Sequence, residues 1–149
     1  MTARVFVDTN VLIYARDLRD NAKCQTAQRW LDELASRRRL LTNLQVLNEF
    51  TRWLLLNERS VPLDRLRREI ELLGEYGGQT PLDPDDVDLA WDVREKLGYQ
   101  WFDCLLIAAA ANAGCGHFLS EDMGHQTRYG SLTIINPFRV DPDAFLKAN

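Results

Sequence analysis

Apolar and polar positions alternate along this chain in blocks that predict strands and helices in turn. The run Val5-Phe6-Val7 is short, continuous and β-favouring, which is typical of a strand covered on both faces. It breaks at Asp8-Thr9-Asn10, three residues that favour turns and helix caps, and apolar residues resume at Val11. The pattern therefore predicts a strand that ends in a carboxylate and leads directly into a helix.

The rest of the chain follows the same alternation. Apolar side chains at three- and four-residue spacing predict helices at about 22–37, after a capping box at 42–45, from Pro62 to Gly77, at 83–97, at 101–111 and from Asp141 onward. Short apolar runs predict strands at 40–42, 79–82, 117–120 and 132–135, with residues 124–131 as a polar loop. Strands alternating with helices favour an α/β fold, with three α/β/α layers and a mostly parallel central sheet.

Composition limits the class of protein. The chain has 149 residues, 46% of them hydrophobic, and suits one domain spanning 1–149. Its longest apolar stretch, 104–111, is too short to cross a bilayer, and its start lacks the basic and apolar regions of a signal peptide. We therefore expect a cytoplasmic protein with no membrane contact. Three cysteines without CxxC spacing argue against a disulfide framework or zinc knuckle, whereas a net charge of −4 neither indicates nor excludes nucleic-acid binding.

Three aspartates stand where ligands bind in such a fold. Asp8 and Asp122 each follow a predicted strand, so a parallel sheet would place both at its carboxyl edge. Asp103 is the only charge in the apolar helix 101–111, and it lies in the first turn, where the helix dipole favours an anion. A buried helix that keeps one Asp at its positive end indicates a site.

A fourth carboxylate belongs to the helix that follows the second predicted strand. Glu49 shares a face with Val46 and Trp53, within or beside an apolar stripe where a carboxylate is costly unless something compensates it. Taken alone, Glu49 fits a salt bridge to Arg52 equally well. Asp8 taken alone fits a helix cap.

Convergence of these acids would require a cation, because like charges at close range raise one another's pKa. Oxygen ligands without Cys or His nearby favour Mg²⁺ or Mn²⁺ over zinc. Such a centre activates water and stabilises charge on a phosphate, so the predicted reaction is phosphodiester hydrolysis. A phosphoaspartyl hydrolase fits less well, because Asn10 stands where it would carry a second Asp. A receiver domain also fits less well, because a late strand ends in Ser120-Glu121-Asp122 instead of Lys.

Five short motifs follow one another along the chain. They are Val7-Asp8-Thr9-Asn10-Val11-Leu12, Gln45-Val46-Leu47-Asn48-Glu49-Phe50, Phe102-Asp103-Cys104-Leu105 with Ile107, Ala108 and Ala110, Leu119-Ser120-Glu121-Asp122-Met123, and Asn136-Pro137-Phe138. In order and approximate spacing they resemble the PIN-domain pattern, and the combination is similar to the VapC-type ribonuclease toxins of bacterial toxin–antitoxin pairs. Any one motif is weak, but five in sequence are specific, and they cover essentially the whole chain.

The resemblance implies a PIN-like fold and a Mg²⁺- or Mn²⁺-dependent endoribonuclease with its catalytic centre at Asp8, Glu49, Asp103 and Asp122. It implies that Asp8 and Asp103 ligate the metal directly, and that Asp122 and Glu49 complete the shell or position water. Hydrogen bonds that orient these carboxylates would come from Thr9, Asn10 and Ser120.

The resemblance also implies partners. They are an RNA substrate, a second copy of the chain in a homodimer, and a cognate antitoxin that blocks the site and forms a heterotetramer or larger complex with the toxin. Two alternatives stay open: a PIN-like nuclease acting in RNA processing or on DNA outside such a pair, and a catalytically silent PIN-like binding module. Side chains that could contact RNA are Arg16, Arg19, Lys23, Arg52 and Arg128 for phosphates, and Tyr14 and Trp101 for bases.

Overall fold

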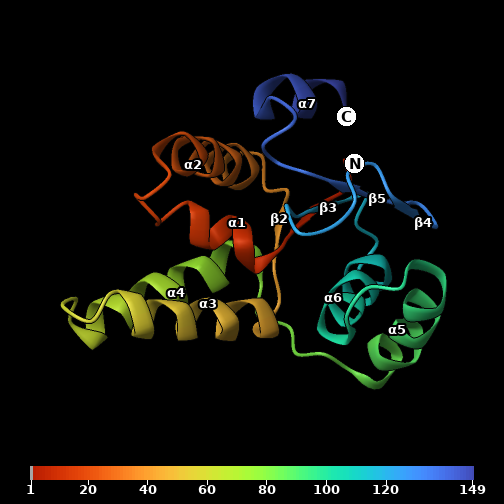
Figure 1. Cartoon of the computed structure of the whole chain (residues 1–149), viewed down its shortest axis with the longest axis horizontal. Helices are drawn as coiled ribbons and strands as arrows, with labels where there is room; N and C mark the ends of the chain where they lie inside the picture. The colour runs from red at the N-terminus through yellow and green to blue at the C-terminus, as the bar shows by residue number, and fades with distance from the viewer. Residues whose placement is uncertain (1) are drawn as a thin grey trace.

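A five-stranded sheet in the order β2-β1-β3-β5-β4 runs through the middle of the structure, a computed structural model that describes residues 2–149 (Figure 1). The strands are β1 (Val5–Val7), β2 (Leu40–Leu41), β3 (His117–Leu119), β4 (Arg128–Tyr129) and β5 (Leu132–Ile135). The first four in spatial order are parallel, and only β4 joins β5 antiparallel. The mostly parallel sheet confirms the predicted fold class.

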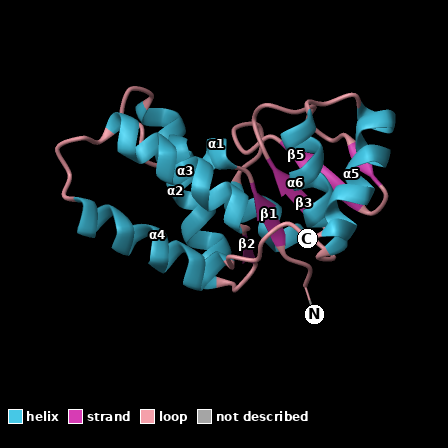
Figure 2. Ribbon diagram, turned by 90° about the horizontal axis from the view of Figure 1, so that it is seen from below, coloured by secondary structure: helices cyan, strands magenta, loops and turns pink. Residues whose placement is uncertain are grey.

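Helices cover both faces of this sheet. They are α1 (Thr9–Tyr14), α2 (Asn21–Ser36), α3 (Leu44–Asn57), α4 (Leu63–Gly77), α5 (Pro84–Leu97), α6 (Trp101–Asn112) and α7 (Pro142–Ala148). Figure 1 places α2 and α7 on one side of the sheet and α5 and α6 on the other, and Figure 2 shows α5 and α6 in front of the strands. Three layers result, as predicted. Within residues 2–149 no helix combines the length and apolarity that crossing a bilayer requires.

The core is built on the apolar run that opens the chain. Every side chain of β1 is at most 1% exposed, because helices pack on both faces of the strand. Phe6 stacks on Phe118, its register partner on β3, with ring centroids 5.2 Å apart. Helix α6 is buried along most of its length, as its uniform apolarity predicts. These contacts hold the carboxyl ends of β1 and β3 beside the start of α6.

Two local predictions about strands are wrong. Residues 79–82 form no strand, because the Thr80 carbonyl accepts a hydrogen bond from the Leu44 amide (3.0 Å) and ties this segment to the start of α3. The predicted loop 124–131 contains β4, which Gly130, with φ of +57°, turns back onto β5. A two-residue strand is too short to show alternation in the sequence.

The start of α3 also differs from the predicted capping box. Asn43 is the cap and accepts a hydrogen bond from the Val46 amide (3.0 Å). Thr42 instead donates its hydroxyl proton to the Gly78 carbonyl (2.9 Å), and Gln45 donates to Glu49. The helix therefore begins one residue later than the Thr42 cap would place it.

Candidate metal centre

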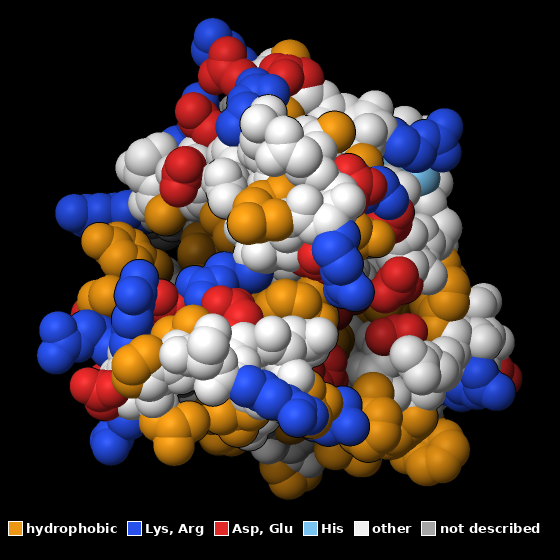
Figure 3. Space-filling model, turned by 60° about the vertical axis from the view of Figure 1, so that its left-hand side comes forward, with side chains coloured by type: hydrophobic (Ala, Val, Ile, Leu, Met, Phe, Trp, Pro, Cys, Tyr) orange, Lys and Arg blue, Asp and Glu red, His pale blue; other side chains and the backbone are white. Residues whose placement is uncertain are grey.

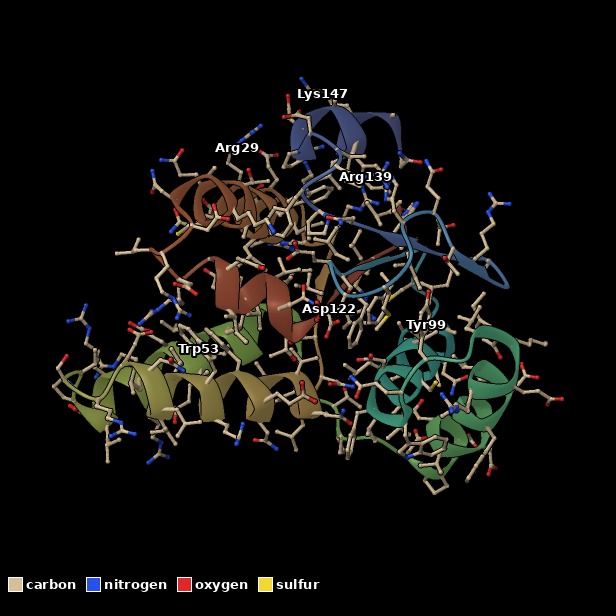
Figure 4. All side chains as sticks on the ribbon, in the orientation of Figure 1. Arg29, Trp53, Tyr99, Asp122, Arg139 and Lys147 are labelled. Atoms are coloured by element: carbon tan, nitrogen blue, oxygen red, sulfur yellow. The ribbon has the colours of Figure 1, made fainter. Side chains whose placement is uncertain are left out.

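All four predicted acidic residues line one cleft of about 410 Å³. Asp8 caps α1 directly after β1, Asp122 follows β3, Asp103 lies in the first turn of α6, and Glu49 projects from α3. Figure 4 shows Asp122 in the centre of the molecule, between α1 and α6. Figure 3 shows acidic side chains recessed in the middle of one face. The parallel pairing of β1 with β3 brings Asp8 and Asp122 to the same edge.

Asp8 is the most enclosed of the four, with 5% of its surface exposed. Its Oδ1 accepts from the Thr9 amide (2.7 Å), and its Oδ2 accepts from the Ser120 hydroxyl (2.8 Å). Burial raises the pKa of Asp8 to about 7, against hydrogen bonds from Ser120 and Thr9 that lower it, and the charges of Asp103 and Glu49 raise it further. The helix-cap role and a place in the acidic cleft, weighed as alternatives from the sequence, both apply to this residue.

The predicted orienting residues link the acids to one another. The Asn10 amide nitrogen lies 3.1 Å from both Asp8 Oδ2 and Asp122 Oδ2. Ser120, fully buried, accepts from the Asp122 amide (3.2 Å) while donating to Asp8. On the other side the Thr9 hydroxyl donates to Glu49 Oε2 (2.8 Å). These bonds hold carboxylates from three separate segments in fixed orientation.

Asp103 and Glu49 complete the cleft in different ways. Asp103 is half-buried, and burial raises its pKa, opposed by a hydrogen bond from Gln100 and reinforced by the charges of Asp122 and Glu49. Glu49 is exposed at the rim, so of the two predicted placements it lies beside the apolar stripe of α3 and not within it. Hydrogen bonds from Thr9 and Gln45 hold it, in place of the alternative salt bridge to Arg52.

The charges in the cleft are not neutralised by the protein. Within residues 2–149 none of the four carboxylates lies within 4.0 Å of a Lys, Arg or His nitrogen. No three acidic, His or Cys side chains of this part of the chain already form a coordination sphere. Mg²⁺ keeps several waters and takes only one or two carboxylates directly, so the all-oxygen set fits a hard divalent cation.

In metal-free buffer, the raised pKa of Asp8 makes stability depend on pH. The folded chain keeps this proton until about pH 7, whereas the unfolded chain loses it near 3.8. The stabilisation from protonation is complete below 3.8 and is lost as the pH rises through about 7. Urea unfolding in EDTA between pH 5 and 8 should therefore show a free energy of unfolding that falls by up to about 1.4 kcal/mol per pH unit.

Asp8→Asn carries no titrating group at this position, so the difference between the two proteins isolates the contribution of Asp8. We expect a flatter pH profile in the variant. An identical slope in both proteins would show that the buried carboxyl titrates normally.

Two cleft residues were not predicted from the sequence. Gln100 hydrogen-bonds Asp103, and its position just before α6 was the available signal. Trp53 lines the cleft from α3 (Figure 4), on the same helix face as Glu49. An aromatic side chain at this spacing is more often core than site, so its sequence pattern alone did not assign it.

Most of the basic and aromatic side chains predicted to contact RNA are engaged by other residues of the protein, whereas one of them lines the cleft. Arg16 is held by Glu58 and Glu69, and Lys23 pairs with Glu121, so neither is free for a phosphate. Arg52 does line the cleft, whereas Arg128 is exposed on β4 and does not line it. Other side chains are also engaged: Arg19 pairs with Asp17, Trp101 packs on Trp91, and Tyr14 lies beneath Lys23.

Comparisons with known proteins agree with this fold. The PIN domain pattern matches residues 5–130. A toxin–antitoxin complex from Klebsiella pneumoniae shares 13% identity and a TM-score of 0.65, over 89% of this chain and 97% of that chain. VapBC2 from Rickettsia felis, bound to a promoter DNA fragment, shares 14% identity and a TM-score of 0.62 over the same 89% and 97%.

A third solved structure is that of VapC20 from Mycobacterium tuberculosis, a Sarcin-Ricin loop cleaving toxin. It shares 24% identity and a TM-score of 0.56, over 76% of this chain and 86% of that chain. No curated protein sequence matches the chain. At these identities the likeness to the solved structures shows a common fold.

Proposed function

Because this chain belongs to the PIN-domain family, we propose that it is a Mg²⁺- or Mn²⁺-dependent endoribonuclease and the toxin of a toxin–antitoxin pair. The observation that carries the proposal is the cleft in which four carboxylates without cationic partners converge. A binding module gains nothing from holding such charges together, because their repulsion destabilises the fold. An enzyme that recruits a divalent cation needs them.

The residues of the cleft have distinct roles in this proposal. Asp8 and Asp103 hold the ion directly, while Asp122 and Glu49 complete its shell or position water. When bound, such an ion would lower the pKa of a water molecule and stabilise the negative charge on the phosphate. Ser120 and Asn10 keep the Asp8 and Asp122 oxygens turned toward the cleft, and Thr9 does the same for Glu49.

The proposal that the chain is a toxin is supported by the kinds of protein that share its fold. Two of them are toxin–antitoxin complexes, and the third is a Sarcin-Ricin loop cleaving toxin. For the present chain we therefore infer an RNA substrate and a cognate antitoxin that blocks the cleft. We also infer a homodimer that forms a heterotetramer or larger complex with this antitoxin. A cytoplasmic location belongs to the same proposal. A short reading frame immediately upstream, whose product co-purifies with the chain and inhibits it, would support the pairing.

The test is direct. Purified protein is incubated with a total small-RNA pool in Mg²⁺, in Mn²⁺ and in EDTA, and the fragments are mapped. We expect discrete fragments that form only with a divalent ion. Folded protein that binds neither ion, measured by thermal shift, and leaves the pool intact would favour the catalytically silent module.

Ser120→Ala tests the orienting hydrogen bonds. The change removes the hydroxyl that donates to Asp8 and accepts from the Asp122 amide, while adding no bulk to a fully buried position. We expect the affinity for Mn²⁺ to fall by about 10–100-fold, because partners that orient metal ligands typically contribute that much. Mn²⁺ titration followed by calorimetry measures it. Ser131→Ala, an exposed serine beside β5, is the control and should bind Mn²⁺ normally.

A further inference from the structure

Basic side chains gather at the edge of the sheet opposite the acidic cleft. A hollow of about 980 Å³ there is lined by Arg4, Arg37, Arg38, Arg39 and Lys147. Arg4 precedes β1 and Arg39 precedes β2, so both lie at the amino ends of parallel strands. Figure 1 shows the start of the chain close to α7, and Figure 4 labels Lys147 on that helix. We call this site the basic hollow.

Arg39 is the central residue of the basic hollow. Only 5% of its surface is exposed, yet within residues 2–149 no carboxylate lies within 4.0 Å of its guanidinium. Its Nε donates to the Ala3 carbonyl (2.9 Å), and the two terminal nitrogens, which are not fully buried, are open to another acceptor. A buried cation without a counter-ion is costly. Burial and the charge of Arg37 accordingly lower the pKa of Arg39.

The surrounding charges leave the basic hollow positive. Arg37 pairs with Glu33 (3.1 Å) and Asp143 (3.5 Å), and Lys147 pairs with Asp143 (3.0 Å). These two carboxylates balance two of the five cations. In the described part of the chain the exposed side chains of Arg4 and Arg38 form no ion pair, so they and Arg39 remain uncompensated.

A purely structural explanation covers only part of the cluster. Cations near the carboxyl end of a helix stabilise its dipole, which accounts for Arg37 as the cap of α2. Arg38 comes next with φ of +55°, a left-handed conformation that glycine adopts more easily. Neither the dipole nor the backbone requires an arginine at that residue, and neither satisfies the terminal nitrogens of Arg39.

We propose that the basic hollow binds a phosphate group, with Arg39 as its buried anchor and Arg4 and Arg38 closing on it. The planar guanidinium donates paired hydrogen bonds that match phosphate oxygens, which makes arginine the suited residue for such a ligand. The phosphate comes either from the backbone of a bound RNA or from a free phosphate compound. The inference does not depend on the proposed nuclease activity, because the basic hollow and the cleft lie at opposite edges of the sheet.

The first experiment titrates the full chain with inorganic phosphate in EDTA, so that no metal can recruit the anion to the acidic cleft. Nitrogen-15 NMR follows the Arg39 Nε–H signal, and thermal unfolding gives an apparent Kd. We expect the Arg39 signal to shift and the midpoint to rise. In the double variant Arg4→Gln/Arg38→Gln, whose exposed positions should not impair folding, the Kd should weaken about tenfold, as loss of a charge-assisted hydrogen bond predicts.

Arg68→Gln is the matched control, because Arg68 is an exposed arginine on α4 without an ion pair among residues 2–149. It should bind phosphate like the unmodified chain. Equal affinity in all three proteins, or no saturable response up to about 10 mM phosphate, would overturn the proposal and leave the cluster as compensation for helix ends.

A second arm identifies the source of the phosphate. The anisotropy of a labelled RNA is measured over a range of salt concentrations in EDTA with Asp103→Asn protein, so that no divalent ion is present to support cleavage. If RNA supplies the phosphate, adding Arg4→Gln/Arg38→Gln should reduce the slope of log K against log salt by about 1. If the slope stays unchanged while the phosphate titration responds, the ligand is a free phosphate compound.

Discussion

Replacing Asp103 by Asn is expected to lower the rate of RNA cleavage on the order of 10³-fold, because a metal centre supplies several kcal/mol of charge stabilisation in the transition state. Asp103 is the better first target than Asp8. Asp8 caps α1 and accepts three hydrogen bonds, so its replacement also changes contacts outside the metal site, whereas Asp103 is half-buried in the first turn of α6. The exchange removes one charge and keeps the shape of the side chain.

Single-turnover cleavage of an identified RNA fragment, with circular dichroism of both proteins, measures this effect. Asp88→Asn is the control, since Asp88 is exposed on α5 and outside the cleft. It should cleave at the unmodified rate. If Asp103→Asn retained full activity with intact structure, the assignment of the catalytic centre would be wrong.

The largest expected loss of stability comes from Trp30→Ala, about 4 kcal/mol, out of a total of about 5–15 kcal/mol for a domain. Trp30 on α2 is fully buried, packs on Phe145 of α7 with centroids 5.6 Å apart, and donates its indole proton to the Pro137 carbonyl (2.8 Å). Truncation leaves a cavity and an unpaired buried carbonyl. Urea unfolding monitored by circular dichroism gives the difference.

Two further variants separate the contribution of the Trp30 hydrogen bond from that of burying its ring. Trp30→Phe keeps a ring but leaves the Pro137 carbonyl without its donor, and should cost about 1–3 kcal/mol. Trp91→Ala removes a tryptophan that is 64% exposed and packs against Trp101, and should cost less than about 1 kcal/mol. Equal losses in Trp30→Ala and Trp91→Ala would contradict the placement of Trp30 in the core.

The sequence by itself determined the layers of the fold and which acids meet in the cleft. Val5-Phe6-Val7 is apolar without a break, which is typical of a strand covered on both faces, and Asp8 follows it directly. The parallel direction of the strands then determines where the second aspartate lies, because parallel strands end at the same edge of the sheet and bring Asp122 beside Asp8. Local patterns sufficed for the three aspartates, since Asp8 and Asp122 follow strands and Asp103 lies in the first turn of α6.

Only the tertiary structure decided which charges are compensated and by what. The sequence shows Arg16, Lys23 and Arg39 as equivalent cations, yet two of them meet carboxylates from distant segments and the third is buried without one. The tertiary structure also places Glu49 at the exposed rim of the cleft, where the Thr9 hydroxyl of α1 donates a hydrogen bond to it. Such pairings depend on side chains that lie far apart along the chain, and no local pattern records them.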